Sequence, residues 1–480
     1  MKPEFYGQGR SPMLARQPVG SVISLARGDS SGDKESAVRK IRAGASASKI
    51  TPPVGGDLAG YARREGPSVG VHDDLWCRTL VLDDGDTRLA LVALDLLSVD
   101  FEVAALLHGA VAGAVGTAPD HVLVNCTHTH AGPWTTERQG HRNAGYLASL
   151  AQRTTETAAA AAQRLAPATI RYGEAPIRVG INRREKKPGG EVEIGRNPEG
   201  VVDTLVRVIE VQAEPPGLGA VLFQHACHGT TLNHENRLVS AEWMGAAASR
   251  LDAKFQGRSI GIFLQGCCGQ INPDAGPSFD EVKRLGSEMA AAVAAALDRS
   301  ATVNAAPLAV RKEQVGLPIQ DPLTGDQARA ELREAEARLE RLRREGAHEY
   351  IVRASEGLVK HAAEMLKRAE RGPRGEMLPF AIQAVRIGEV AMVGLSGEVF
   401  FEFAGEIEAK SPFARTLVLG YTNGCTCYIP TQEAFAEGGY EAEDSFRWYQ
   451  IPPLRPQAGD IMAAAAVRIL EDLWRGGPPS

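Results

Sequence analysis

The chain has 480 residues and a formal net charge of −6 at pH 7, with 44% hydrophobic and 23% charged residues. This composition is typical of a soluble globular protein and excludes a largely disordered or fibrous chain. The acidic balance excludes nucleic acid as the main partner, because no surplus of Lys and Arg is available to neutralise phosphates. No apolar stretch is long enough to span a membrane or to act as a secretory signal, so we expect a cytoplasmic protein.

The chain is expected to begin with a flexible extension, residues 1–44, where Gly, Ser and Arg are frequent and no helical or strand period is visible. From residue 45 to 475, short apolar runs alternate with longer Ala- and Leu-rich segments. This pattern predicts one α/β domain with mixed β-sheets and flanking helices. The predicted strands are Leu89–Leu94, His121–Asn125, Ala220–Gln224, Ile260–Leu264, Val390–Leu395 and Thr416–Leu419. The predicted helices are Phe101–Val115, Asn143–Leu165, Glu242–Phe255, Ser278–Leu297 and Asp460–Leu473.

The segment 326–371 has a different pattern. Apolar residues recur at alternating steps of three and four among many charges, at Leu332, Ala335, Leu339 and Leu342. A second Ala- and Leu-bearing stretch follows a break at Gly346, so the pattern predicts an antiparallel helical hairpin inserted into the α/β body. Such a hairpin can serve as a solvated arm, as a lid or as a contact between copies of the chain.

Polar residues follow each predicted strand. In α/β sheets the pocket lies outside the carboxyl ends of the strands, so these residues are expected to converge on one cleft if the strands are neighbours. In chain order they are Asp95, His128 with His130, His228, the segment Gly266–Pro273, Ser396-Gly-Glu398 and Gly420-Tyr-Thr-Asn423.

His128 and His130 suggest a metal site. They are two residues apart in a segment predicted to be extended, which would place both side chains on the same side, within reach of one ion. His228 and Glu398 are natural further ligands, because zinc takes three or four N, O or S ligands. A single buried histidine is more often structural, but three histidines and a carboxylate at strand ends favour metal binding.

Other polar positions leave several interpretations open. Gly269 and the pair Asn272-Pro273 predict a tight turn, whose backbone N–H groups can point at negative charge on a ligand, or which can be only a turn. The loops around Asp73 and Arg183 can serve binding or solvation.

Cys227 next to His228 suggests a thiol nucleophile, but adjacent residues of an extended segment face opposite ways, so we expect the cysteines to be packing residues.

Several short motifs occur in a fixed order along the chain. They are Ile50-Thr-Pro-Pro53 with Gly60-Tyr61, Thr127-His-Thr-His-Ala-Gly-Pro133, His228-Gly-Thr-Thr231, Gly269-Gln-Ile-Asn-Pro273, Gly397-Glu398, and Tyr428-Ile-Pro-Thr431 followed by Tyr440-Glu441. With these motifs, the sequence resembles the neutral/alkaline non-lysosomal ceramidase family from about Ala45 to Leu473.

The resemblance implies a zinc ion held by His128, His228, Glu398 and Tyr428, and only the resemblance suggests the tyrosine. It further implies that His130 and Arg183 handle protons and polarise the substrate carbonyl. Arg184 is the adjacent alternative to Arg183 in that alignment. Tyr440 matches a second active-site tyrosine of the family.

Two departures from the family bear on the substrate. Ceramidases carry Gly-Asp-x-Ser-Pro in the turn, whereas this chain has Gln270 and Asn272 at the aspartate and serine positions, which excludes serine-based chemistry there. The chain also ends soon after Leu473, without length for the immunoglobulin-like C-terminal domain of ceramidases. A membrane sphingolipid is therefore not the expected substrate.

We expect a zinc-dependent hydrolase that cleaves the amide bond of a small acyl-amide or peptide-like compound with an activated water. His130 would move the proton, while Arg183 and Tyr440 would stabilise the oxyanion. Gly269 and Asn272 would bind the substrate, with backbone N–H groups near Gly269 assisting. Two alternatives stay open, namely a metal-dependent esterase or lactonase, and a non-catalytic metal-binding scaffold or sensor.

Overall fold

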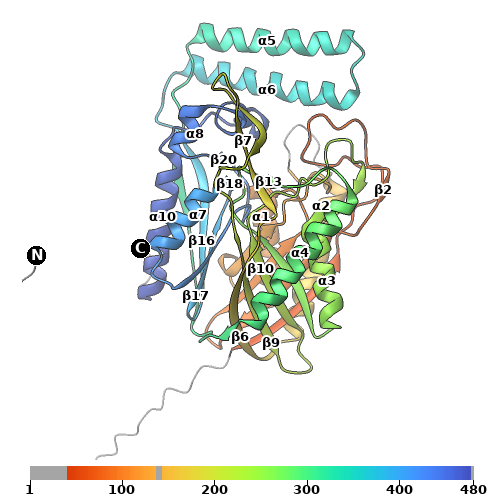
Figure 1. The fold of residues 1–480 in the computed structure, drawn as a ribbon. Coiled ribbons are helices and arrows are strands. Elements are labelled where there is room, and N and C mark those ends of the chain that lie inside the picture. The colour runs from red at the N-terminus through yellow and green to blue at the C-terminus, as the bar shows by residue number, and fades with distance from the viewer. Residues whose placement is uncertain (1–40, 137–142, 477–480) are drawn as a thin grey trace, which may run out of the picture. The chain divides into compact units, whose positions relative to one another are not determined.

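Two β-sheets packed face to face form the centre of the fold in the computed structural model, which describes residues 41–136 and 143–476 (Figure 1). All of these residues belong to one compact unit, Arg39–Ser480. The facing sides of the sheets share one apolar cluster, to which the first sheet contributes Leu91 and Leu222 and the second Val385 and Leu417. Each such fully buried side chain stabilises the fold by about 1.5–3 kcal/mol.

The first sheet has nine strands within the described residues, in the order β12-β10-β9-β6-β1-β3-β4-β5, with β14 beside β6. Neighbours are antiparallel except β10 with β12 and β4 with β5, which are parallel. The strands are β1 (Arg42–Lys49), β3 (Trp76–Asp83), β4 (Arg88–Leu94), β5 (Val122–Cys126), β6 (Ala166–Pro176), β9 (Leu205–Ala213), β10 (Gly219–His225), β12 (Ser259–Gln265) and β14 (Ala301–Thr302).

The second sheet has the order β15-β16-β17-β19, in which only β17 and β19 are parallel. Smaller ladders join loops at one end of both sheets: β13-β7-β8, β11-β2 and β18-β20. The strands of these sheets are β2 (Gly70–Val71), β7 (Gly180–Lys186), β8 (Val192–Asn197), β11 (Leu238–Val239), β13 (Ile271–Pro273), β15 (Leu308–Pro318), β16 (Met377–Ile387), β17 (Val390–Leu395), β18 (Glu398–Val399), β19 (Arg415–Leu419) and β20 (Tyr428–Ile429).

Helices cover the outer face of each sheet, which gives four layers in the order helix, sheet, sheet, helix (Figure 1). On the first sheet lie α1 (Phe101–Val115), α2 (Ala144–Gln163), α3 (Glu242–Phe255) and α4 (Phe279–Asp298). On the second lie α7 (Phe401–Lys410) and α10 (Ala458–Arg475). Shorter helical turns are Pro119–His121, α8 (Gln432–Glu437), the π-helical turn Tyr440–Asp444 and α9 (Ser445–Tyr449).

A hairpin of two long helices, α5 (Gly325–Arg344) and α6 (Glu349–Arg371), lies between β15 and β16 in the chain and at the top of Figure 1. The Thr324 side chain and the Gln327 side chain cap the start of α5 reciprocally, and Gly346 turns the chain with φ 68°. The hairpin is tied down through α6, because Tyr350 Oη donates to Asp57 Oδ1 at 2.6 Å and Arg353 Nη1 to Asp57 Oδ2 at 2.9 Å.

The α/β class, with mixed sheets, flanking helices and an inserted helical hairpin, is confirmed. Each of the six predicted strands and five predicted helices corresponds to an observed element, with ends that differ by at most two residues. One expectation needs correction: β1 already begins at Arg42, inside the range assigned to the N-terminal extension, because Ala43 and Ala45 pack in the core between the sheets. The rest of that extension, 1–40, lies outside the described residues. No helix among the described residues is long and apolar enough to cross a membrane.

Candidate metal centre and active site

The three histidines of the predicted site come from two adjacent loops. One loop follows β5 and carries His128 and His130, and the other follows β10 and carries His228. A parallel bridge pairs Thr129 with Gly229, and the His130 N–H donates to Gly229 O at 3.1 Å. These backbone bonds hold the loops together, and one ring nitrogen from each of the three histidines lies within 4.8 Å of those of the other two.

The reason for expecting His128 and His130 on the same side was wrong, although the two side chains do meet. His128 has a left-handed backbone with φ 64°, and β5 ends at Cys126, so the segment is not a regular strand. The two Nε2 atoms lie 3.1 Å apart. A non-glycine residue in this conformation costs of the order of 1–3 kcal/mol, and such strain is concentrated at functional sites.

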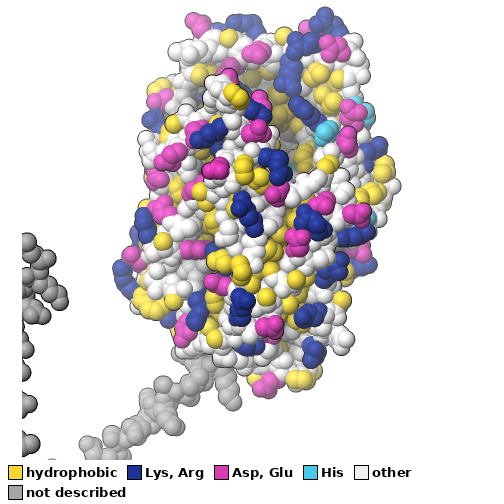
Figure 2. All heavy atoms as spheres, in the orientation of Figure 1, with side chains coloured by type: hydrophobic (Ala, Val, Ile, Leu, Met, Phe, Trp, Pro, Cys, Tyr) yellow, Lys and Arg dark blue, Asp and Glu magenta, His cyan; other side chains and the backbone are white. Residues whose placement is uncertain are grey.

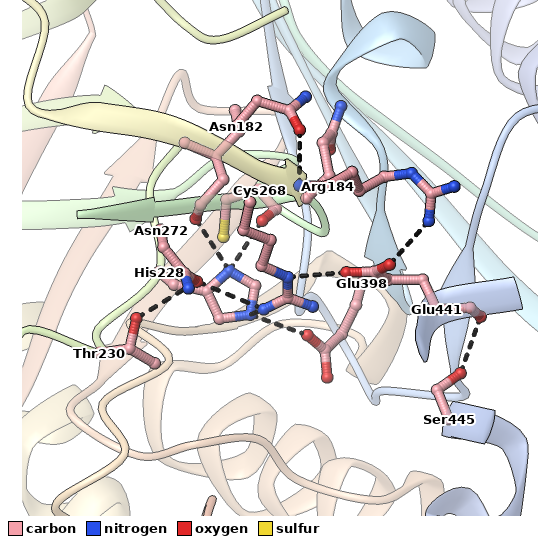
Figure 3. Close-up of polar contacts among 12 residues, drawn as sticks. Asn182, Arg184, His228, Thr230, Cys268, Asn272, Glu398, Glu441 and Ser445 are labelled. Atoms are coloured by element: carbon pink, nitrogen blue, oxygen red, sulfur yellow. Dashed lines mark hydrogen bonds and ion pairs between the residues drawn. The ribbon is translucent and has the colours of Figure 1, made fainter. Parts of the chain in front are cut away.

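Glu398 completes the cluster from the other half of the fold. Its Oε2 lies 3.4 Å from His128 Nε2 and 3.2 Å from His228 Nε2, and Figure 3 shows the Glu398 side chain turned toward His228. Glu398 is paired with Tyr428 in the parallel ladder of β18 and β20, and both residues line the same cavity. Thus the sequence-predicted metal residues His128, His228, Glu398 and Tyr428 come together in one place.

The remaining ring nitrogens explain why the Nε2 atoms face the carboxylate. His128 Nδ1 lies 2.7 Å from Leu97 O, and His228 Nδ1 lies 2.7 Å from Cys268 O. An Nδ1–H that donates to a carbonyl leaves the Nε2 lone pair free to bind an ion, which is the usual arrangement of metal-ligating histidines. The donor set therefore fits a zinc-type cation.

The electrostatics of the cluster agree with that fit. Burial alone would raise the pKa of Glu398, but the neighbouring His128 and His228 hold it well below its ordinary value. Burial, and then the proximity of His128 and His228, lowers the pKa of His130 well below its usual range. The cluster thus favours an ionised carboxylate beside a neutral imidazole, the forms in which these groups bind cations and accept protons.

Arg183 lies against the histidines, whereas Arg184 does not. Arg183 Nη1 is 3.3 Å from His228 Nε2, and Arg183 Nη2 is buried without a hydrogen-bond partner among the described residues. Arg184 donates instead to Gly438 O at 2.8 Å and to Glu441 Oε2 at 2.9 Å, the contact drawn in Figure 3. Since buried guanidinium nitrogens are rarely left unpaired, Arg183 Nη2 is a natural donor to a ligand.

Tyr440 lies close to Arg183 and Tyr428. The Arg183 guanidinium carbon is 5.9 Å from the centre of the Tyr440 ring, and the rings of Tyr440 and Tyr428 meet edge to face at 5.7 Å. Tyr440 also lines the cavity, and its pKa is raised above the ordinary value, first of all by burial. Its hydroxyl is therefore a neutral donor at physiological pH.

The expectation for Gly269 is corrected. Its N–H donates to Val399 O at 3.0 Å and is not free for an oxyanion. A Cβ at this position would lie 2.6 Å from the Glu398 carbonyl oxygen, so Gly269 allows the close approach of Glu398. Asn272 contacts Arg183, whose Nη1 donates to Asn272 Oδ1 at 3.3 Å, and Figure 3 shows Asn272 beside His228.

Several residues near the site were not predicted as part of it. Tyr449 Oη donates to Glu398 Oε1, Tyr421 Oη donates to Glu398 Oε2 at 3.2 Å, and the buried Arg64 donates to His130 O at 2.7 Å. Tyr421 belongs to the polar segment after β19, so its position was a usable signal. Tyr449 lies on the short helix α9, where no pattern marks it.

Other polar strand-end residues have structural roles. Asp95 Oδ2 accepts from the Trp76 N–H at 2.9 Å, and Asp73 accepts from Ser240 Oγ at 2.6 Å and from the Ala241 N–H at 2.7 Å. Cys227 packs in the core against the helices, and burial raises the pKa of its thiol well above the ordinary value. A thiol nucleophile is therefore not favoured.

A cavity of about 680 Å³ leads from the cluster to the surface. Its lining includes the cluster residues His128, His130 and Glu398 and, on the opposite side, residues of α5 and α6 such as Arg338 and Leu358. In Figure 2 the surface is hollowed below the hairpin, and charged side chains of both signs border the hollow. The hairpin thus forms part of the wall of the cavity.

The comparisons with known proteins identify the family. The sequence model described as neutral/alkaline non-lysosomal ceramidase, N-terminal, matches residues 42–304. The neutral ceramidase of Mycobacterium tuberculosis is 24% identical over 467 residues, which cover 82% of this chain and 72% of that protein. The neutral ceramidase of Drosophila pseudoobscura pseudoobscura is 26% identical over 246 residues, which cover 46% of this chain and 34% of that protein.

Solved structures share the fold. The crystal structure of neutral ceramidase from Pseudomonas aeruginosa superposes with a TM-score of 0.68 and 20% identity, over 92% of this chain and 75% of that one. A ceramidase complexed with C2 gives a TM-score of 0.68 with 16% identity, over 92% of this chain and 76% of that one. Because the family's sequence model spans more than half of the chain, the protein belongs to the neutral/alkaline non-lysosomal ceramidase family, whose members are hydrolases that cleave amide bonds.

Proposed function

We propose that the protein is a zinc-dependent hydrolase that cleaves the amide bond of a small acyl-amide or peptide-like compound. The observation that carries this proposal is the meeting of His128 Nε2, His228 Nε2 and the Glu398 carboxylate at one end of a cavity. His128, His228 and Glu398 would hold the ion, with Tyr428 beside them. When bound, zinc supplies Lewis acidity, which lowers the pKa of water and polarises a carbonyl group.

His130 is the proton-transfer group of the proposed reaction. It lines the cavity beside His128, and its Nδ1 has no hydrogen-bond partner among the described residues. A neutral imidazole here can take a proton from the attacking water and return it to the nitrogen of the leaving amine as the C–N bond breaks. The Arg64 bond to the His130 carbonyl fixes the loop that carries this ring.

Arg183 and Tyr440 are the proposed oxyanion donors. The unpaired Nη2 of Arg183 and the Tyr440 hydroxyl would donate to the carbonyl oxygen as it gains negative charge. Gly269 does not contribute, because its N–H already donates to Val399 O. Asn272 would act as a positioning residue that accepts from Arg183, in place of the serine found in ceramidases.

The proposal is tested by metal analysis joined to a panel of matched amides and esters. We expect about one zinc per chain and turnover of amides, and loss of both in His128→Ala. His72→Ala is the control, because His72 is exposed and stacks on Phe279 away from the cavity lining. Amide turnover that neither chelation nor His128→Ala lowers would contradict the proposal. Turnover of the esters alone would identify the protein as an esterase instead.

A further inference from the structure

We propose that the substrate carries an acidic group, which binds between the guanidinium groups of Arg63 and Arg338 at the outer end of the active-site cavity. Arg63 lies in the loop after Tyr61, and Arg338 lies on α5 of the helical hairpin. The inference rests on the proposed amide hydrolysis at the histidine cluster and names the substrate class of that same site.

The location is the junction of two cavities. A second cavity of about 660 Å³ adjoins the active-site cavity, and both are lined by Ala62, Arg63, His234, Arg338 and Trp448. These shared residues include two guanidinium groups and one imidazole, and no carboxylate. A small ligand whose amide lies at the histidines can therefore extend along the first cavity to a site that is locally basic.

The two arginines have no competing partner in the part of the chain that the structure describes. Neither Arg63 nor Arg338 forms a hydrogen bond or ion pair within residues 41–136 and 143–476, and the same is true of the His234 ring. An exposed arginine without a partner is ordinary by itself. Arg63 and Arg338, however, are 275 positions apart in sequence and line the same junction. A planar guanidinium can donate two parallel hydrogen bonds to two oxygens of one carboxylate, sulfonate or phosphate, so two such groups together favour an acidic ligand.

Carboxylates near the junction lie to either side of it. Glu331 and Glu334 line only the active-site cavity, while Glu65 and Glu235 line only the second cavity. Glu235 also accepts from Asn233 Nδ2 at 3.2 Å. An acidic group deeper in either cavity would meet these carboxylates, so the junction is the favoured position for it.

This inference gives the hairpin a defined role. Arg338 reaches the junction from α5, and the contacts of Tyr350 and Arg353 with Asp57 hold α6 against the loop that precedes Arg63. His361 Nε2 donates to Ile451 O at 3.0 Å and fixes the other half of α6. The hairpin would then select substrates by charge as well as cover the cavity.

The test is a charge series of small amides. N-hexanoylglycine carries the acid on the amine side and N-propyladipamic acid carries it on the acyl side, while N-hexanoylethanolamine is neutral and N-hexanoylethylenediamine is cationic. For wild-type protein we expect the lowest KM for one of the two acids, and which acid it is shows the direction of binding. The preference should weaken as ionic strength rises.

The variants are Arg63→Gln and Arg338→Gln, with Arg333→Gln as the matched control, since Arg333 is also exposed on α5 but lines neither cavity. The ratio of KM for the acid to KM for the neutral amide should rise about tenfold in the first two variants and stay constant in the control. A lower KM for the cationic amide, or a ratio that none of the variants moves, would overturn the inference.

A binding measurement distinguishes failure of the proposed hydrolysis from failure of the proposed acid site. If no amide in the series is turned over, the proposed function fails, but calorimetric binding of N-hexanoylglycine and of N-propyladipamic acid still tests the junction. Tenfold weaker binding by the Arg63→Gln, Arg338→Gln double variant than by Arg333→Gln supports an acid site. Equal affinity of the two proteins for the acid, or no detectable binding of the acid by either protein, refutes the acid site.

Discussion

Arg183 and Glu441 form a buried ion pair directly behind the histidine cluster, with Arg183 Nε 2.7 Å from Glu441 Oε1. The other oxygen of the same carboxylate accepts from Arg184 Nη1 at 2.9 Å. One glutamate therefore fixes two neighbouring arginines in different orientations. The Arg183 guanidinium reaches His228, while that of Arg184 reaches the backbone carbonyl of Gly438.

The two arginines should respond differently to substitution. Arg183→Gln removes the unpaired Nη2 that is proposed to stabilise the oxyanion, so we expect kcat/KM to fall about 10²–10³-fold. Arg184→Gln should lower stability more than activity, because Arg184 satisfies backbone carbonyls around α8. Steady-state kinetics and thermal unfolding of both variants provide the measurement. If Arg184→Gln lost as much kcat/KM as Arg183→Gln, the assignment of the two roles would be wrong.

The residues of the proposed metal site could be predicted because they follow buried strands. β5, β10 and β17 are short, nearly fully buried apolar runs, and His128, His228 and Glu398 come within three residues of their ends. These strands are not neighbours, since β10 and β5 lie near opposite ends of the first sheet and β17 lies in the second. The loops that follow them meet instead, with Thr129 of one bridged to Gly229 of another. Tyr428 has no such signal of its own, since its position next to Glu398 depends on the pairing of two residues in β18 with two in β20.

The other features of the fold and the site depend on long-range contacts that no local sequence pattern indicates. Strands such as β15 mix buried and exposed residues, so their antiparallel pairing with β16 was not visible as an apolar run. The left-handed backbone of His128 is uncommon for a residue other than glycine, so no local propensity predicts it. Tyr449 and Arg338 approach the cavity from the short helix α9 and the hairpin, which only the tertiary fold places there.

Tyr449 is expected to tune the affinity for metal. Its hydroxyl donates to Glu398 Oε1, and loss of a group that orients a metal ligand typically weakens metal binding 10–100-fold. We therefore predict that Tyr449→Phe raises the zinc Kd by about tenfold, measured by chelator competition. Tyr146→Phe is the control, because its hydroxyl donates to Ile50 O in the core and does not line the cavity. An unchanged Kd in Tyr449→Phe would remove this role.

A methyl group at Gly269 should disturb the site through the backbone. The added Cβ would lie 2.6 Å from the Glu398 carbonyl oxygen and 2.9 Å from Phe400 Cδ1, so the chain around Glu398 must shift. We predict that Gly269→Ala lowers the unfolding free energy by about 1–3 kcal/mol and weakens zinc binding. Gly276→Ala, where nothing lies within 4 Å of the new Cβ, should stay close to wild type. Urea unfolding and zinc titration measure both effects, and a stable Gly269→Ala variant with normal metal affinity would contradict the prediction.

Glu242 should make the stability of the protein depend on pH. Burial raises the pKa of Glu242 from 4.5 to about 7, while its Oε1 accepts from the Leu232 N–H at 2.7 Å. Between these two values the folded protein holds a proton that the unfolded chain has released, so the free energy of unfolding falls as pH rises through this window and is level above it. The fall contributed by this group is of the order of 3 kcal/mol.

The Glu242→Gln side chain cannot titrate, so the stability of this variant relative to wild type should improve by that order between pH 5 and pH 8. Glu235→Gln, an exposed change in the neighbouring loop, should keep the wild-type profile. Parallel pH profiles for wild type and Glu242→Gln in urea unfolding would show that Glu242 is ionised in the folded protein across the whole range.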